Sequence, residues 1–270
     1  MTAQQADDGA QAGAADLHIR LPAETSLHTP ATEIPESPIL NAAGQAGAEP
    51  APVRIRDHPN WYYLLREFYE LYRFLPSGGS DRIRGHQRAV RERISALIQA
   101  NAPLRFGACE EKPVTAYLRR VLDEGRVEKH APVIRAIDAV RTGLNWQYGY
   151  DKVPRGLSQK FAYAEIAGPN APVHSEAVIL GLVLFAPGCT YPTHAHDGIT
   201  ESYVCLSGAV SENHQGVYAP GSLIFNPPGQ HHRITVSDRE PSLLAYAWIG
   251  AREKLSHQRM AFSRAPRKRL

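Results

Sequence analysis

Four side chains that could bind a metal ion are spread over two stretches of the sequence. His194 and His196 are one residue apart, Glu201 follows five residues later, and His232 lies in the second stretch. Because side chains alternate along an extended segment, two histidines at this spacing point to the same side. Imidazole and carboxylate groups together favour Fe(II), Mn(II), Ni(II), Co(II) or Zn(II) over Ca(II). The pattern therefore predicts a site for one divalent transition metal ion.

Both stretches carry glycine and proline at fixed distances from these groups. The first reads G-x5-H-x-H-x4-E-x6-G from Gly188 to Gly208, and the second reads G-x5-P-x-G-x2-H from Gly221 to His232. A lone H-x-H pair is weak evidence, but the two complete motifs, in this order, resemble those of the cupin superfamily. The resemblance implies a cupin β-barrel with the four side chains as metal ligands. Alternation should turn the adjacent His231 away from the metal.

Two tyrosines flank the first motif. Tyr191 stands three residues before the first histidine, and Tyr203 stands two residues after the glutamate. Together with the run 243–248 and the lead-in 150–165, this arrangement resembles the cupin-type dimethylsulfoniopropionate (DMSP) lyases, closest to their L-type branch. The resemblance covers about residues 57–252. It implies a carbon–sulfur lyase that converts DMSP to dimethyl sulfide and acrylate.

The implied reaction is a β-elimination. A base removes the proton alpha to the carboxylate, a divalent metal stabilises the charge that develops on that carboxylate, and the sulfonium leaves as a neutral thioether. Tyr203 and Tyr191 are the candidate bases. We favour Tyr203 because it shares a strand face with Glu201, although a free tyrosine has a pKa of ~10 and would need a nearby cation. Aromatic faces attract a sulfonium cation. The candidates are Trp248, Tyr246 and Phe225.

Other functions remain open on the sequence alone, because the cupin fold hosts many activities. The chain could be another metal-dependent cupin enzyme, such as a dioxygenase or an isomerase. It could also be a ligand- or metal-sensing regulator that binds a protein partner through the helical residues 58–146. The tyrosine pair beside the motif favours the lyase.

Four amphipathic helices are predicted before the motifs. Apolar residues recur at helical spacing over 61–72, 83–98, 114–122 and 133–144. We expect the helical region, 53–148, to be a packing layer, and homodimerisation through this region remains open.

After Gly149 the sequence changes to short apolar runs broken by glycine, proline and asparagine. Such runs predict a β-sandwich or barrel. The predicted strands are 177–185, 201–207, 222–225, 233–236 and 243–248. The expected fold class is mainly β, with the cupin barrel over 149–255 preceded by the helical region. Residues 1–52 lack apolar periodicity and are predicted to be disordered, and 256–270 form a basic tail.

Composition excludes several classes of protein. The net charge of +3 is too small to indicate nucleic-acid binding, and three widely spaced cysteines predict no disulfide framework. The polar N-terminus does not resemble a secretory signal, and no apolar run approaches the ~20 residues of a membrane helix. We therefore expect a cytoplasmic protein that acts on a small zwitterionic molecule, without nucleic acid or a membrane span.

Overall fold

The structure is a computed structural model that describes residues 52–127, 129–149, 153–257 and 260–262. Of the predicted tail 1–52, only the last residue is described, and most of the predicted tail 256–270 also lies outside the described residues. All described residues fall within the unit Pro50–Leu270. Among them, no helix combines the length and apolar character needed to cross a membrane.

The four predicted helices are present. They are α1 (Pro59–Phe74), α2 (Asp81–Gln99), α3 (Leu118–Gly125, continuing the 3-10 turn η2, Pro113–Tyr117) and α4 (Ala131–Val140). The shorter helices are η1 (Ile55–Asp57), η3 (Arg141–Gly143), α5 (Arg155–Ser158) and α6 (Arg252–Ser256).

The boundaries of the first two long helices follow from local chemistry. α1 begins at Pro59, whose ring suits the first helical position. It ends at Phe74 because the next residue, Leu75, precedes a proline and is held in an extended conformation. α2 is capped by Ser80, whose side chain accepts a hydrogen bond of 3.3 Å from the Ile83 backbone N–H.

The larger of two sheets has seven strands in the order β1-β2-β4-β10-β6-β8, with β3 beside β2. Only the β2–β3 pairing is parallel. The strands are β1 (Trp146–Gln147), β2 (Phe161–Gly168), β3 (Val173–His174), β4 (Ile179–Phe185), β6 (Ile199–Ser207), β8 (Leu223–Asn226) and β10 (Ser242–Gly250). Strand β1 belongs to this sheet although it lies within the region expected to be helical.

The second sheet has four strands in the order β11-β5-β9-β7. They are β11 (Met260–Phe262), β5 (Thr190–His196), β9 (His232–Val236) and β7 (Val210–Glu212). Strand β11 lies within the segment expected to be a tail, and it pairs with β5. The five predicted strands correspond to β4, β6, β8, β9 and β10, so the predicted fold class of N-terminal helices followed by antiparallel sheets is confirmed.

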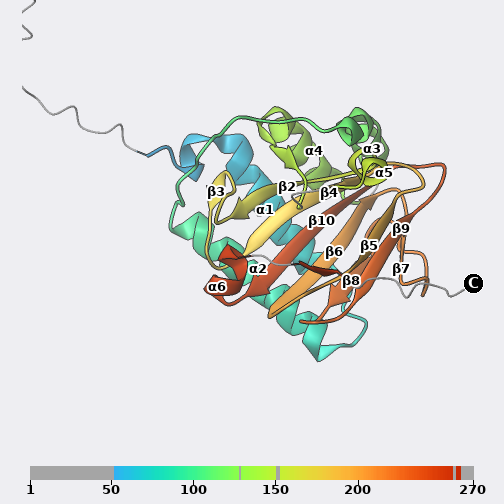
Figure 1. Cartoon of the computed structure of the whole chain (residues 1–270). Helices are drawn as coiled ribbons and strands as arrows, with labels where there is room; N and C mark the ends of the chain where they lie inside the picture. The colour runs from blue at the N-terminus through green and yellow to red at the C-terminus, as the bar shows by residue number, and fades with distance from the viewer. Residues whose placement is uncertain (1–51, 128, 150–152, 258–259, 263–270) are drawn as a thin grey trace, which may run out of the picture. The chain divides into compact units, whose positions relative to one another are not determined.

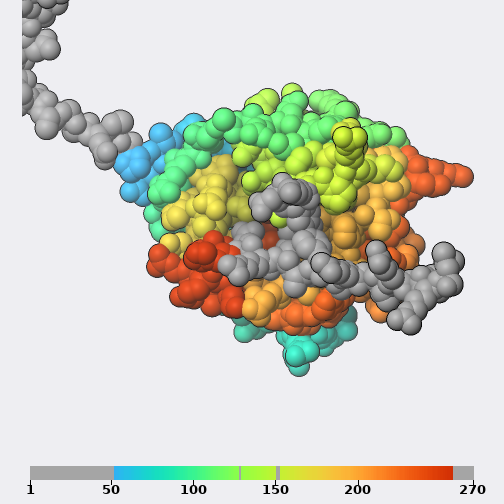
Figure 2. Space-filling model, in the orientation of Figure 1, coloured from blue at the N-terminus to red at the C-terminus, as the bar shows by residue number. Residues whose placement is uncertain are grey.

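The larger sheet has a different core on each face, as β6 illustrates. Val204 and Leu206 belong to the core shared with the helices, whereas Tyr203 and Cys205 belong to the core between the two sheets. Figure 1 shows α1, α2 and α4 on one side of the larger sheet and β5, β7 and β9 on the other. In Figure 2 the blue-to-green helical residues border the strand residues above and below. The face of β6 that carries Tyr203 and Cys205 therefore points into the buried core between the two sheets.

Candidate metal centre

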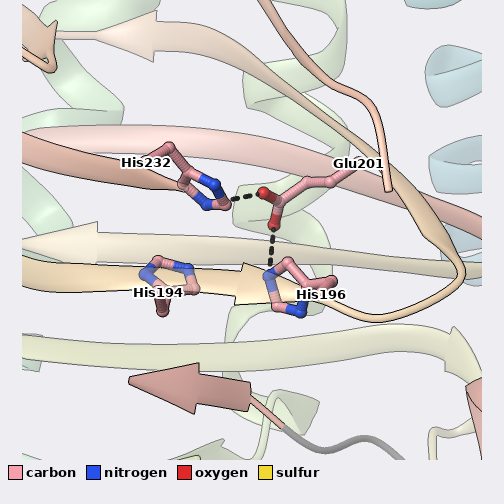
Figure 3. A group of neighbouring side chains, drawn as sticks. All are labelled: His194, His196, Glu201 and His232. Carbon is pink, nitrogen blue, oxygen red and sulfur yellow. Dashed lines mark ion pairs between the residues drawn. The ribbon is translucent and has the colours of Figure 1, made fainter. Parts of the chain in front are cut away.

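The four histidine and glutamate side chains of the two motifs come from three strands. His194 and His196 lie on β5, His232 begins β9 directly opposite His194, and Glu201 lies near the start of β6. The turn between β5 and β6 contains Gly198 with a φ of 71°, a left-handed conformation that favours glycine. Figure 3 shows the four side chains pointing toward one another.

All four groups are withdrawn from solvent. The exposed fractions are 1% for His194, 4% for His196 and 0% for both Glu201 and His232. Each residue offers one ligand atom, and these atoms lie within 4.8 Å of one another. Three imidazoles and one carboxylate that converge at this distance inside a protein form a candidate metal site.

The unsatisfied nitrogens of this cluster test whether a cation fits. His232 Nε2 lies 2.9 Å from Glu201 Oε2, and His196 Nε2 lies 3.5 Å from Glu201 Oε1. Neither nitrogen makes a hydrogen bond to any described residue. Buried polar atoms without partners are costly. A cation between the rings and the carboxylate would satisfy these atoms, so the residues present fit a metal ion.

Backbone contacts set the tautomers of two of the rings. His194 Nδ1 lies 2.8 Å from the Pro192 carbonyl oxygen, and His232 Nδ1 lies 3.1 Å from the Gln230 carbonyl oxygen. A carbonyl oxygen can only accept, so each Nδ1 carries the proton. In the neutral ring the lone pair is then on Nε2, the atom that a metal ion would bind.

Burial and mutual proximity shift the charges in the cluster. Burial, with a further effect of His232, lowers the pKa of His194 to about 3, so that its ring is neutral. Burial raises the pKa of Glu201, but His196 and His232 outweigh this effect and hold it well below its usual value. Glu201 in turn overcomes the effect of burial on His232 and raises the pKa of that ring. The carboxylate is therefore ionised and able to bind a cation.

Glu201 is held by neutral donors on both sides of its strand. Trp248 Nε1 donates to Glu201 Oε1 at 2.7 Å, and Asn226 Nδ2 donates to Glu201 Oε2 at 3.3 Å. Asn226 Oδ1 accepts from Gln230 Nε2 at 3.3 Å. Neither Asn226 nor Gln230 was predicted from the sequence to contribute to the site. Both residues lie within the second motif, which ends at the ligand His232, and this position in the sequence could have indicated that they lie near the site.

The tyrosines of the first motif lie beside the cluster. Tyr203 is buried, and burial first, followed by the negative charge of Glu201, raises its pKa well above 10. The Tyr203 ring lies 6.2 Å from the His232 ring, between centroids. The Tyr191 ring lies 4.8 Å from the His194 ring, between centroids. The Tyr246 ring lies 6.4 Å from that of Tyr203. The structure therefore brings both candidate bases and two candidate substrate-binding rings, Tyr246 and Trp248, into the core between the two sheets.

Phe225 does not join them, so the expectation that it lines the site is corrected. It pairs across strands with Ser202, which faces the helices and contacts the Tyr72 hydroxyl at 2.8 Å. The Phe225 ring packs against His86 on this side, with centroids 5.4 Å apart. Strand alternation thus directs Phe225 away from the metal cluster. The same alternation leaves His231 exposed, as expected.

Comparisons with known proteins identify relatives that share most of this chain. A family model described as dimethylsulfoniopropionate lyase matches residues 86–244, which include the four residues of the cluster. A protein of Cereibacter sphaeroides, provisionally named dimethylsulfoniopropionate lyase DddL, is 49% identical over 216 residues. This match spans 80% of the present chain and 93% of the relative.

Two solved structures resemble the fold. One comes from crystal structures of the DMSP lyases RdDddP and RnDddQII, with a TM-score of 0.58 and 22% identity over 76% of this chain and 98% of the other. The second is DMSP lyase DddQ from Ruegeria pomeroyi DSS-3, with a TM-score of 0.55 and 20% identity over 72% and 92%. At these identities the likeness concerns the fold.

Proposed function

The chain belongs to the dimethylsulfoniopropionate (DMSP) lyase family, and we propose that it cleaves DMSP to dimethyl sulfide and acrylate. The observation that carries this proposal is the buried cluster of three histidines and a glutamate inside the region that the family model matches. An oxygenase, an isomerase or a regulator would share the cupin fold, but the match to DMSP lyases favours elimination.

We assign the metal-binding role to His194, His196, Glu201 and His232. Three nitrogen donors and one carboxylate suit Zn(II), Fe(II), Mn(II), Ni(II) or Co(II). When bound, such an ion would act as a Lewis acid toward the substrate carboxylate and would lower the pKa of a nearby tyrosine hydroxyl. Trp248 and Asn226 keep the Glu201 carboxylate oriented toward the histidines.

Tyr203 is the base that we favour. It lies two residues after Glu201 on the same face of β6, and its ring is 6.2 Å from the His232 ring, between centroids, so it is beside the cluster that would hold the substrate carboxylate. The phenolate takes the proton from this carbon, and the C–H electron pair forms the double bond of acrylate. The C–S electron pair leaves with sulfur, so that dimethyl sulfide departs uncharged and no acid is needed.

Tyr191 is the alternative base, because its ring contacts that of His194. It packs on Phe161, with centroids 4.4 Å apart, within the apolar core that surrounds the cluster. In our assignment Tyr191 positions the substrate and limits access of water. An interior that excludes water strengthens the electrostatic interactions of the reaction.

The test is turnover by the purified protein. DMSP is added, dimethyl sulfide is measured in the headspace and acrylate in solution, with the protein as isolated, after chelation, and after each candidate metal is restored. We expect equal amounts of both products, loss on chelation and recovery with at least one metal. Absence of both products with every metal would overturn the proposal, and consumption of O₂ without dimethyl sulfide would indicate an oxygenase.

A further inference from the structure

One buried acid inside the barrel has no role in the mechanism above. Among the described residues, the buried carboxylates are Glu165, Glu201 and Glu212. Glu201 belongs to the metal cluster, and Glu212 ends β7, which pairs with β9, the strand that carries the ligand His232. Glu165 lies on β2. In the larger sheet, β4 and β10 lie between this strand and β6, which carries Glu201.

Strand register connects Glu165 to the proposed base. Glu165 pairs with Gly181, Gly181 pairs with Tyr246, and Tyr246 pairs with Tyr203, in one row across β2, β4, β10 and β6. Residues directly opposite in neighbouring strands project from the same face. Glu165 therefore points into the same interior as Tyr203.

Gly181 removes any side chain between the acid and Tyr246. A Cβ atom at Gly181 would lie 2.5 Å from Tyr246 Cε1 and 2.6 Å from Cζ. Such distances are not tolerated, so the Tyr246 ring lies across β4, over the glycine, toward Glu165. Burial first, and then the negative charge of Glu165, raises the pKa of Tyr246, in agreement with this placement.

Aromatic rings continue from this point to the cluster. The Tyr246 ring lies 5.5 Å from the Trp248 ring, and Trp248 pairs across strands with Ile179. Glu165 Oε2 and the Ile179 side chain both lie beside Gly168, within 3.0 and 3.5 Å of the position that its Cβ would take. A carboxylate thus lies at one end of an aromatic-lined part of the interior, and the metal cluster lies at the other.

A sulfonium group has a permanent positive charge and no hydrogen to donate. It is recognised by aromatic faces and by negative charge that is weakly screened in a buried site. We propose that Glu165, with the ring of Tyr246, forms the subsite for the dimethylsulfonio end of the substrate, while the carboxylate end faces the metal cluster. This inference rests on the proposed function, and it makes Glu165 a determinant of specificity for a cationic β-substituent.

Two unreactive ligands that differ only in charge isolate this interaction. 3-(Trimethylammonio)propanoate carries the cation, and 4,4-dimethylpentanoate replaces its nitrogen with carbon. Their dissociation constants are measured by calorimetry on the metal-loaded wild type and on Glu165→Gln, with metal content and circular dichroism checked for each protein. We expect the wild type to prefer the cation and Glu165→Gln to reduce this preference at least tenfold, with KM for DMSP rising more than kcat falls.

Controls separate charge from packing. Glu165→Asp keeps the charge and should retain most of the preference, and Glu212→Gln removes another buried carboxylate and should leave the ratio unchanged. If Glu165→Gln does not fold, Glu165→Met provides a neutral side chain suited to an apolar interior. An unchanged ratio in the folded neutral variant would overturn the subsite. Because binding is measured without turnover, a wild type that prefers the cation but releases no dimethyl sulfide would contradict the proposed function alone.

Discussion

The indole N–H of Trp248 donates to Oε1 of Glu201 at 2.7 Å, across the pairing of β10 with β6. On the other side of β6, Asn226 donates to Oε2 of the same carboxylate. The two oxygens of a metal ligand are thus held by donors from both neighbouring strands. This gives Trp248 a role in orienting the metal site, in addition to the aromatic face that it offers to a sulfonium cation.

The Trp248 contact predicts weaker metal binding when the donor is lost. Trp248→Phe keeps an aromatic ring but removes the N–H, so Glu201 is less well oriented, and we expect affinity to fall ~10-fold or more. Calorimetric titration of the metal-free protein with Zn(II) or Co(II) measures this change. Phe225→Leu, on the opposite face of the sheet, is the control and should bind as the wild type does. Equal affinity in all three proteins would show that the hydrogen bond does not orient the ligand.

Removal of a ligand ring should abolish stoichiometric metal binding. His196→Ala and His232→Ala each delete one buried nitrogen that faces Glu201. We expect both variants to fold, as judged by circular dichroism, while elemental analysis finds little metal and turnover is lost. His194→Ala should be milder, because flexible coordination by the remaining ligands can compensate. A variant with one metal ion per chain would remove that residue from the ligand set.

The base assignment predicts a large loss of turnover without loss of binding. Tyr203→Phe keeps the ring and removes the hydroxyl that would take the proton. We expect kcat to fall by ~10²-fold or more, with little change in metal content or KM. Tyr191→Phe serves as the comparison and should have a smaller effect. The opposite ranking would transfer the role to Tyr191, and less than a tenfold effect in both would assign the proton to another group.

The buried His86 predicts that stability decreases in acid. Burial, with a further effect of Arg93, lowers the pKa of His86 from 6.5 to about 4. In the unfolded chain His86 therefore becomes protonated as the pH falls through 6.5, whereas in the folded chain it becomes protonated only near pH 4. Stability is fully present above pH 6.5 and decreases as the pH falls through this window, by up to about 3 kcal/mol.

Urea unfolding of metal-free protein at pH 7 and pH 4.5 measures this effect. His86→Gln can keep a hydrogen bond to Ser202, whose hydroxyl lies 2.8 Å from His86 Nε2, but does not titrate. The wild type should lose more stability than the variant between the two pH values. If both lose the same amount, other groups account for the acid sensitivity.

The sequence by itself determined the grouping of the four candidate metal ligands. Two histidines one residue apart must share a strand face, and glycine and proline at fixed positions set the turns that return Glu201 and His232 to them. The long helices were equally predictable, because their apolar residues recur at helical spacing and their ends carry proline or a capping serine. Both features depend on neighbours along the chain.

The contacts around the cluster were decided by tertiary structure. Trp248 and Asn226 meet Glu201 only because β10 and β8 lie on either side of β6, an order that no local pattern specifies. Phe225 was a candidate substrate-binding residue on the sequence alone, but its pairing with Ser202 places it on the face of the larger sheet that packs against the helices. Glu165 joins the same interior through three successive strand pairings that span residues far apart in sequence. The alternation of side chains along a strand predicts which residues share a face of that strand. Only the packing of the sheets and helices decides which other residues each face contacts.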